Sequence, residues 1–212
     1  HEFKTPLAVI TSYGSALRDK TMSDEERQGY VETILSATGK LSVLVTDILK
    51  LNKLEHQEII SPQVYALDEQ LRCCLLDFEE VMDQKALDWE ADLEEEVMIQ
   101  SDEGLLAILW HNLIQNAIKF NPIGGKLYMT LKRQDKYAVV SIQDTGCGMD
   151  QETQKRLFER FYQGETSHSR EGNGLGMAMV ARILKLTGSS LTIDSVVGEG
   201  TTITILIPLT KL

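Results

Sequence analysis

The chain has little cysteine, little proline and no long apolar run. Its 212 residues include four prolines and three cysteines, of which Cys73 and Cys74 are adjacent. Three cysteines so placed exclude a disulfide framework, predict a reducing compartment and fit no zinc-ligand spacing. No apolar run approaches the roughly 20 residues that a membrane-spanning helix needs, and the chain shows no signal-peptide pattern.

Basic residues are also scarce relative to acidic ones. The chain has 21 Lys and Arg against 32 Asp and Glu, which gives a net charge of -11. Because nucleic-acid binding needs clustered basic side chains at the phosphates, this balance argues against a nucleic-acid partner. The length allows one large or two small domains, and a hydrophobic share of 42% is typical of a soluble globular protein.

Residues 1 to about 57 have the pattern of two helices. Apolar residues alternate steps of four and three, which is the spacing of a heptad seam. The seam residues are Phe3, Leu7, Ile10, Gly14 and Leu17 in the first helix, and Ile34, Ala37, Leu41, Leu44, Ile48 and Leu51 in the second. Ser23 and Glu26 form a capping-box pattern at the start of the second helix. An antiparallel hairpin of this kind buries little apolar surface alone, so we expect a dimeric four-helix bundle.

Beyond a linker at Ser61 and Pro62, helical and strand patterns are mixed. Helical patterns cover 69–85, 102–120, 151–161 and 175–186, the second beginning at a capping residue, Asp102. Strand patterns cover 97–100, 125–133, 137–143, 190–195 and 201–208. Over residues 62–212 this predicts an α/β sandwich with a mixed, mostly antiparallel sheet, and an α+β class for the whole chain.

Polar side chains interrupt the apolar pattern of the helix expected at 102–120. Asn112, Asn116 and Lys119 are spaced four and three apart and therefore share one face. Amide oxygens suit magnesium, and a lysine offers a positive charge to a phosphate. The alternative is the solvated face of an ordinary amphipathic helix.

Three glycine-rich stretches follow that helix. Asp144 ends a strand before Gly146 and Gly148. A carboxylate there can accept a hydrogen bond from the exocyclic amine of a base. The alternative is an ordinary turn, in which Asp-x-Gly is common. Gly172, Gly174 and Gly176 surround Leu175 and lead into a helix, whose first N–H groups can bind phosphate; a flexible loop is the alternative. Neither a P-loop nor a dinucleotide-binding pattern is present.

Taken in order, these motifs resemble those of the sensor histidine kinases of two-component signalling. Residues 1–7 (HEFKTPL) resemble the H box, and residues 112–120 the N box. The glycine boxes correspond to 144–149, 172–177 and 198–202, and the F box to 157–161. The resemblance implies a dimerisation and phosphotransfer hairpin over residues 1–57. It also implies a Bergerat-type ATP-binding domain over residues 62–212.

By this resemblance His1 accepts the γ-phosphoryl group of ATP, and Glu2 acts as its general base or orients the ring. A neutral imidazole beside a carboxylate is a competent nucleophile. Taken alone, a terminal histidine is an ordinary surface residue or the remnant of a tag. Thr5 matches the position that orients water when the partner protein is dephosphorylated. The alternative is a helix hydroxyl that only donates to a backbone carbonyl of the same helix.

The resemblance also assigns the nucleotide contacts. It places magnesium at Asn116 and the phosphates at Asn112 and Lys119. It places the adenine amino group at Asp144. Arg160 matches a basic position near phosphate, although a surface salt bridge fits equally, and Thr201 adds a hydroxyl contact or serves only as a strand residue. The segment 162–171 corresponds to a mobile ATP lid.

The implied reaction is transfer of phosphate from MgATP to His1 and then to an aspartate on the receiver domain of a response regulator. The partners are a second copy of the chain and that regulator. The family implies the cytoplasmic portion of a membrane-anchored sensor, and we expect the sensor and any membrane segment upstream of His1. Two alternatives remain: an ATPase of the gyrase and Hsp90 type, which usually has glutamate where Asn112 stands, or a nucleotide-binding adaptor without phosphotransfer.

Overall fold

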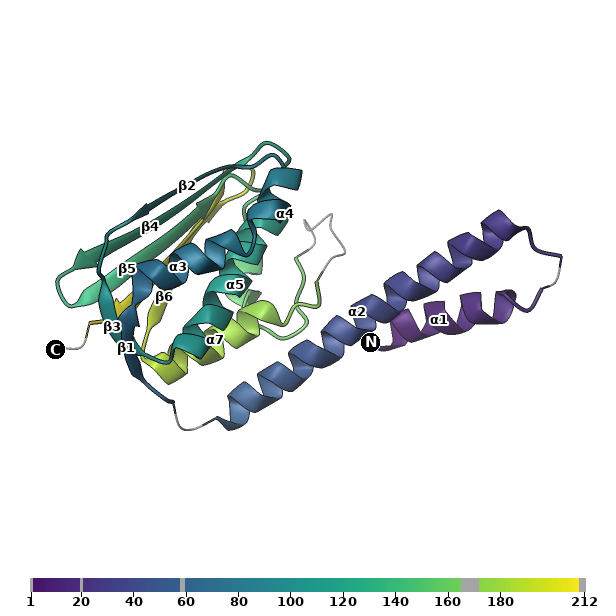
Figure 1. Cartoon of the computed structure of the whole chain (residues 1–212), viewed down its shortest axis with the longest axis horizontal. Helices are drawn as coiled ribbons and strands as arrows, with labels where there is room; N and C mark the ends of the chain where they lie inside the picture. Colours follow the sequence, from purple (N-terminus) through teal and green to yellow (C-terminus); the bar gives the residue numbers. More distant parts are fainter. Residues whose placement is uncertain (1, 20, 58–59, 165–171, 210–212) are drawn as a thin grey trace. The chain divides into compact units, whose positions relative to one another are not determined.

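The computed structural model describes residues 2–19, 21–57, 60–164 and 172–209 (Figure 1). The chain divides into two compact units, His1–Lys53 and Leu54–Leu212. Each unit is described by itself. Across the described residues, no helix combines the length and the apolar character that crossing a membrane requires.

The first unit is a hairpin of two helices, α1 (Lys4–Ala16) and α2 (Asp24–His56), whose last residues extend past this unit. The predicted capping box opens α2: the backbone N–H of Glu26 donates to Ser23 Oγ at 3.2 Å, and that of Ser23 donates to Glu26 Oε2 at 3.0 Å. The rings of Tyr13 and Tyr30 pack edge to face with centroids 4.9 Å apart, which joins the two helices near the turn.

The predicted seam is confirmed in α2, where Ala37 and Leu44 are buried. In α1 the predicted seam is only partly buried within the hairpin, since Ile10 and Leu17 are half-buried. Phe3 and Leu7 are 40% and 49% exposed, and the half-buried positions are Pro6, Val9, Ile10, Tyr13, Ala16 and Leu17. Within one chain α1 has a single neighbouring helix, so its heptad stripe does not have to face that neighbour.

Seven strands lie in the described part of the second unit. They are β1 (Gln63–Ala66), β2 (Asp88–Leu93), β3 (Met98–Ser101), β4 (Lys126–Gln134), β5 (Tyr137–Asp144), β6 (Ser190–Val196) and β7 (Gly200–Pro208). Strands β1 and β3 pair antiparallel, and the larger sheet has the order β2-β4-β5-β7-β6. Only the β2–β4 pair of that sheet is parallel, which confirms a mixed, mostly antiparallel sheet.

Helices cover one face of this sheet. They are α3 (Leu67–Leu76), α4 (Glu79–Gln84), α5 (Glu103–Phe120), α6 (Gln151–Arg156) and α7 (Gly176–Thr187). Figure 1 shows α3, α5 and α7 on the same side of the strands. Alternate residues of β4 are fully buried, and so is Trp110 of α5, which lies in the core.

Two predicted helices differ from the structure, and two strands were missed. The helix expected at 69–85 is broken at Asp77 and Phe78 into α3 and α4, and the helix expected at 151–161 ends at Arg156. Strands β1 and β2 were not predicted. Strand β2 reads DWEADL, and acidic residues are poor strand formers except at an edge, where Asp88 and Asp92 form ion pairs with lysines of β4.

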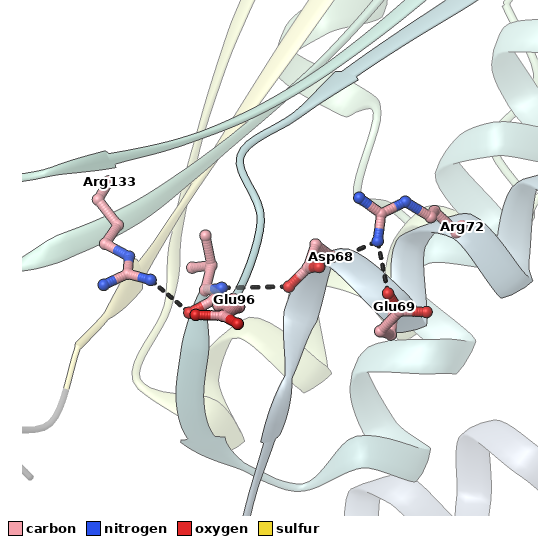
Figure 2. Close-up of polar contacts among 6 residues, drawn as sticks. Asp68, Glu69, Arg72, Glu96 and Arg133 are labelled. Carbon is pink, nitrogen blue, oxygen red and sulfur yellow. Dashed lines mark hydrogen bonds and ion pairs between the residues drawn. The ribbon is translucent and has the colours of Figure 1, made fainter.

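A buried carboxylate ties the start of α3 to the segment between β2 and β3 (Figure 2). Asp68 is 3% exposed, and its Oδ1 accepts the backbone N–H of Val97 at 3.1 Å. Its Oδ2 accepts from Arg72 at 3.0 Å, and the same guanidinium reaches Glu69 at 2.6 Å. Arg133 of β4 donates to the carbonyl of Glu96, so the segment is held from both sides.

Replacing Asp68 tests this anchor. Asp68→Ala leaves the buried N–H of Val97 without an acceptor, so we expect the free energy of unfolding to fall by about 2 to 3 kcal/mol. Glu69→Ala is the matched control, because it removes only the exposed partner of Arg72 and costs less than about 1 kcal/mol. Urea denaturation measures both, and equal losses would contradict the anchor.

Candidate functional site

Helix α5 is the platform of the site. Its predicted capping residue is confirmed, since Asp102 Oδ1 accepts the N–H of Leu105 at 3.0 Å. Its apolar residues are buried against the sheet and the neighbouring helices. Asn112, Asn116 and Lys119 lie half-buried along the remaining face, which is the face predicted from their spacing.

The second glycine loop lies against this polar face. A β-carbon on Gly176 would lie 2.5 Å from Asn112 Oδ1, and one on Gly172 would lie 3.1 Å from Lys119 Nζ. The amide nitrogen of Asn112 donates to the carbonyl of Ile108 at 2.7 Å, which directs its oxygen to the start of α7. Asn112 and Lys119 are therefore brought together with the loop at 172–176.

The start of α7 has no side-chain cap. Leu175 occupies the position before the helix, is fully buried and offers no capping atom. Its own N–H donates to Asn173 Oδ1 at 3.1 Å, so the loop is held in shape by Asn173. The first N–H groups of α7 then carry a partial positive charge suited to an anion.

The first glycine loop gathers around Asp144 at the end of β5. Asp144 is 9% exposed, and its Oδ1 accepts the N–H of Gly146 at 2.8 Å. Across the sheet it is paired with Thr201 of β7. The N–H of Cys147 donates to the carbonyl of Phe120 at 3.2 Å. The loop is thereby joined to the end of α5.

Two glycines permit backbone contacts that no other residue would allow. A β-carbon on Gly148, where φ is 63°, would lie 1.9 Å from the carbonyl oxygen of Val196. A β-carbon on Gly200, where φ is 120°, would lie 2.0 Å from the carbonyl oxygen of Asp144. The β6–β7 turn is consequently seated directly on the first glycine loop.

Burial raises the pKa of Asp144 from 3.8 to about 6, against the opposing effect of the backbone N–H groups of Gly146 and Thr201. Among the described residues, no charged side chain offsets the cost of desolvating the carboxylate. A buried carboxylate with so few partners is suited to accept a hydrogen bond from a ligand.

The lid predicted at 162–171 lies largely outside the described residues. At its base the N–H of Phe161 donates to the carbonyl of Gly174 at 3.0 Å, which joins the two ends of the segment. Phe161 itself has φ of 61° and is 41% exposed, whereas Phe158 is half-buried.

The remaining predicted residues are placed as follows. Arg160 forms an ion pair with Glu55, as in the alternative of a surface salt bridge. Asn116 makes no hydrogen bond to another described residue through its side chain, and Thr201 is 9% exposed. Glu2 and Thr5 are exposed, and His1 lies outside the described residues.

Sequence reasoning missed two residues that support the site. Ser195 and Gln154 both hydrogen-bond to Met149 at the end of the first glycine loop. Neither carries a signal in the sequence, because a serine in an alternating strand and a glutamine in a helix are ordinary surface choices.

A cavity of about 630 Å³ lies elsewhere, between β1, α3 and the first half of α5. It is lined by residues such as Tyr65, Cys73 and His111, and by none of the predicted nucleotide residues. The chemistry of the glycine loops, and not the size of this cavity, therefore locates the candidate site.

Comparison with known proteins agrees with this geometry. The sequence model described as histidine kinase-, DNA gyrase B-, and HSP90-like ATPase matches residues 101–211, and the chain belongs to this family. The His Kinase A (phospho-acceptor) domain model matches residues 1–57. The two matches in this order make the chain the core of a sensor histidine kinase of two-component signalling.

Individual relatives support the same assignment. The sensor histidine kinase RppB of Synechocystis is 34% identical over 221 residues, which cover 99% of this chain and 47% of RppB. Histidine kinase ThkA, solved with the response regulator protein TrrA, matches with a TM-score of 0.83 and 21% identity over 99% of this chain and 59% of ThkA. ShkA, solved with AMPPNP, gives a TM-score of 0.74 and 26% identity over the whole chain and 45% of ShkA. The chain spans less than half the length of the curated relatives it matches first.

The raised pKa of Asp144 predicts a pH-dependent stability. The folded protein holds this proton more tightly than the unfolded chain, so ionisation of Asp144 lowers the free energy of unfolding as pH rises from about 4 to about 6. Asp144→Asn removes this loss. Between pH 4 and pH 7 we expect the stability difference to move in favour of Asp144→Asn by up to about 3 kcal/mol, measured by urea denaturation.

Asp135→Asn is the control for this experiment. Asp135 is exposed in the β4–β5 turn, and its replacement leaves the pH dependence as it was. A stability difference between Asp144→Asn and the unchanged protein that stays constant from pH 4 to pH 7 would refute the buried, ionisable carboxylate.

Proposed function

We propose that this protein transfers the γ-phosphoryl group of MgATP to His1 and then to an aspartate on the receiver domain of a response regulator. In this proposal residues 1–57 dimerise and carry the phosphoryl group, and residues 62–212 bind ATP. The observation that carries it is the meeting of Asn112 and Lys119 with the uncapped start of α7. The buried carboxylate of Asp144 lies beyond the end of the same helix, α5.

The two ends of the nucleotide have different requirements. Asp144 accepts from the exocyclic amine of adenine, and its burial excludes water that would compete for the carboxylate. The N–H groups at the start of α7 and the ammonium of Lys119 bind the phosphates. Gly146, Gly148 and Gly174 let the two glycine loops pack closely against neighbouring backbone, which shapes the site around the ligand. Arg160 joins the phosphates if its ion pair with Glu55 opens.

Asn116 fits a magnesium ligand. Its amide is half-exposed on the same face as Asn112 and Lys119, and it makes no hydrogen bond to another described residue that would compete. A hard cation accepts such an amide oxygen together with phosphate oxygens and waters. When bound, the ion neutralises phosphate charge during transfer.

The reaction at His1 follows from imidazole chemistry. A ring nitrogen forms a bond to the γ-phosphorus, the bond from that phosphorus to the bridging oxygen breaks, and ADP leaves. Glu2 takes the ring proton or orients the ring for attack. Catalysis then consists mostly of positioning and charge neutralisation.

The partner and location are inferred from relatives. ThkA was solved in complex with the response regulator protein TrrA, which supports a receiver domain as the partner of this chain. In that pairing Thr5 would orient water for removing phosphate from the regulator. The family relationship supports a cytoplasmic place within a membrane-anchored sensor.

The hairpin supports a homodimer. Besides its buried seam, α2 carries a second stripe at alternating steps of four and three, formed by Val31, Leu35, Thr38, Ser42, Val45 and Leu49. Its apolar members are 40–64% exposed, and Phe3 and Leu7 of α1 are exposed as well. A second copy of the hairpin would cover these side chains in a four-helix bundle.

Incubation with labelled ATP and magnesium tests the kinase. We expect a phosphoprotein whose label is acid-labile and alkali-stable, as a phosphohistidine is, and none in His1→Gln. Asn116→Ala should lower the labelling rate by about a hundredfold, the size of one lost electrostatic contact in a transition state. Gln115→Ala, on the exposed side of the same helix, is the matched control and keeps the rate.

Two outcomes would contradict the kinase. Release of inorganic phosphate without any phosphoprotein would indicate an ATPase of the gyrase and Hsp90 type. Nucleotide binding with neither product, weakened in Asn116→Ala, would indicate an adaptor.

Sedimentation tests the dimer. Replacing Leu35 and Leu49 together by glutamine removes the largest apolar side chains of the exposed stripe, so we expect dissociation to monomers, with a dimer dissociation constant raised at least about a hundredfold. Lys40→Gln is the matched control, since Lys40 is exposed off the stripe. An unchanged dimer in the double variant would place the interface elsewhere.

A further inference from the structure

Ser195 of β6 is the meeting point of two glycine boxes. Its Oγ accepts the backbone N–H of Met149, at the end of the first glycine loop, at 2.9 Å. The same oxygen lies 3.1 Å from the carbonyl of Gly200, to which it donates, and 2.9 Å from the hydroxyl of Thr201. One half-buried hydroxyl thus contacts residues that are 46, 5 and 6 positions away in the sequence.

The proton count at this hydroxyl defines its hydrogen bonds. A serine hydroxyl has one proton and two acceptor lone pairs. Because the carbonyl of Gly200 can only accept, the proton of Ser195 is directed to it. The N–H of Met149 occupies one lone pair, so Thr201 donates its own proton to the other. Thr201 then presents only acceptor lone pairs on its remaining side.

Both segments held by Ser195 also contact Asp144. The loop that ends at Met149 supplies the N–H of Gly146, and the strand that begins at Gly200 supplies the N–H of Thr201. Gly146 donates to the carboxylate at 2.8 Å, Thr201 is the strand partner of Asp144, and both N–H groups favour the ionised carboxylate. The orientation of Asp144 therefore depends on the relative position of two segments that Ser195 joins.

Gln154 of α6 makes a second connection between the same segments. Its amide nitrogen donates to the carbonyl of Met149 at 3.0 Å and to the carbonyl of Ser195 at 3.0 Å. Both bonds are at least partly buried, so water competes weakly for these groups. Gln154 keeps the backbone of Ser195 beside the loop, while the hydroxyl of Ser195 makes the remaining bonds.

We propose that Ser195 is a positioning residue for adenine recognition, which acts through Thr201 and the first glycine loop to aim the Asp144 carboxylate at the exocyclic amine. Ser195 does not itself contact the base. The inference rests on the proposed nucleotide site, and it concerns only how the base is selected.

The test compares two nucleotides that differ only at the exocyclic amine. ATP carries this amine, and purine riboside 5′-triphosphate lacks it. The ratio of their dissociation constants, measured by calorimetric titration with magnesium, reports the contact of Asp144 with the amine. We expect ATP to bind the unchanged protein at least about tenfold more tightly, as a hydrogen bond to a charged group predicts.

Ser195→Ala is expected to reduce this ratio to about threefold or less, mainly by weakening the binding of ATP. Ser195→Thr keeps the hydroxyl and should keep the ratio. Ser190→Ala is the matched control, because Ser190 is exposed on the same strand. A general loss of folding in Ser195→Ala would weaken the binding of both nucleotides equally and leave the ratio unchanged. The ratio therefore separates an effect on the position of Asp144 from an effect on folding stability.

Each result of this experiment either supports the inference or overturns it. A reduced ratio in Ser195→Ala, with the ratio retained in Ser195→Thr and Ser190→Ala, supports the inference. An unchanged ratio in Ser195→Ala, or a ratio lost equally in Ser195→Thr, overturns it while the proposed kinase stands. If the unchanged protein binds neither nucleotide, the proposed function fails and the inference fails with it.

Discussion

The structure depends on the division of α5 into two faces. Its apolar face is packed under the sheet, with Trp110 fully buried, and this packing fixes the rotation of the helix about its axis. Once that rotation is fixed, Asn112, Asn116 and Lys119 must lie together on the other face. The loop at 172–176 then lies against Asn112 and Lys119, and the loop at 144–149 is joined to the end of the helix at Phe120. A change that rotated α5 would separate the polar side chains from the two glycine loops.

Local signals in the sequence predicted a large part of this arrangement. The capping residues Ser23 and Asp102 and the mixed sheet are as expected, because each depends on neighbours within a few positions or on regular periodicity. The order of the glycine boxes predicted the family. The grouping of Asn112 and Lys119 with the second glycine loop followed from helical spacing and that order.

Other features depend on distant partners and could not be predicted in this way. Strand β2 is rich in acidic residues, and only its position beside the lysines of β4 makes it a strand. The break after α3 has no proline or glycine to mark it, since Asp77 and Phe78 are compatible with a helix. Ser195 and Gln154 are defined by bonds to residues up to 46 positions away, so no local pattern distinguishes them. The seam of α1 is only partly buried in the hairpin, because a heptad pattern describes a stripe and does not say which neighbour covers it.

The acidic strand β2 has a consequence for how copies of this protein can associate. It forms one edge of the five-stranded sheet, with Asp88, Glu90 and Asp92 at alternate positions. Two such edges brought together would place like charges opposite one another along their whole length, which opposes extension of the sheet between molecules. The open backbone of β2 is thereby kept from pairing with the same edge of another copy and from seeding aggregation at this side of the sheet.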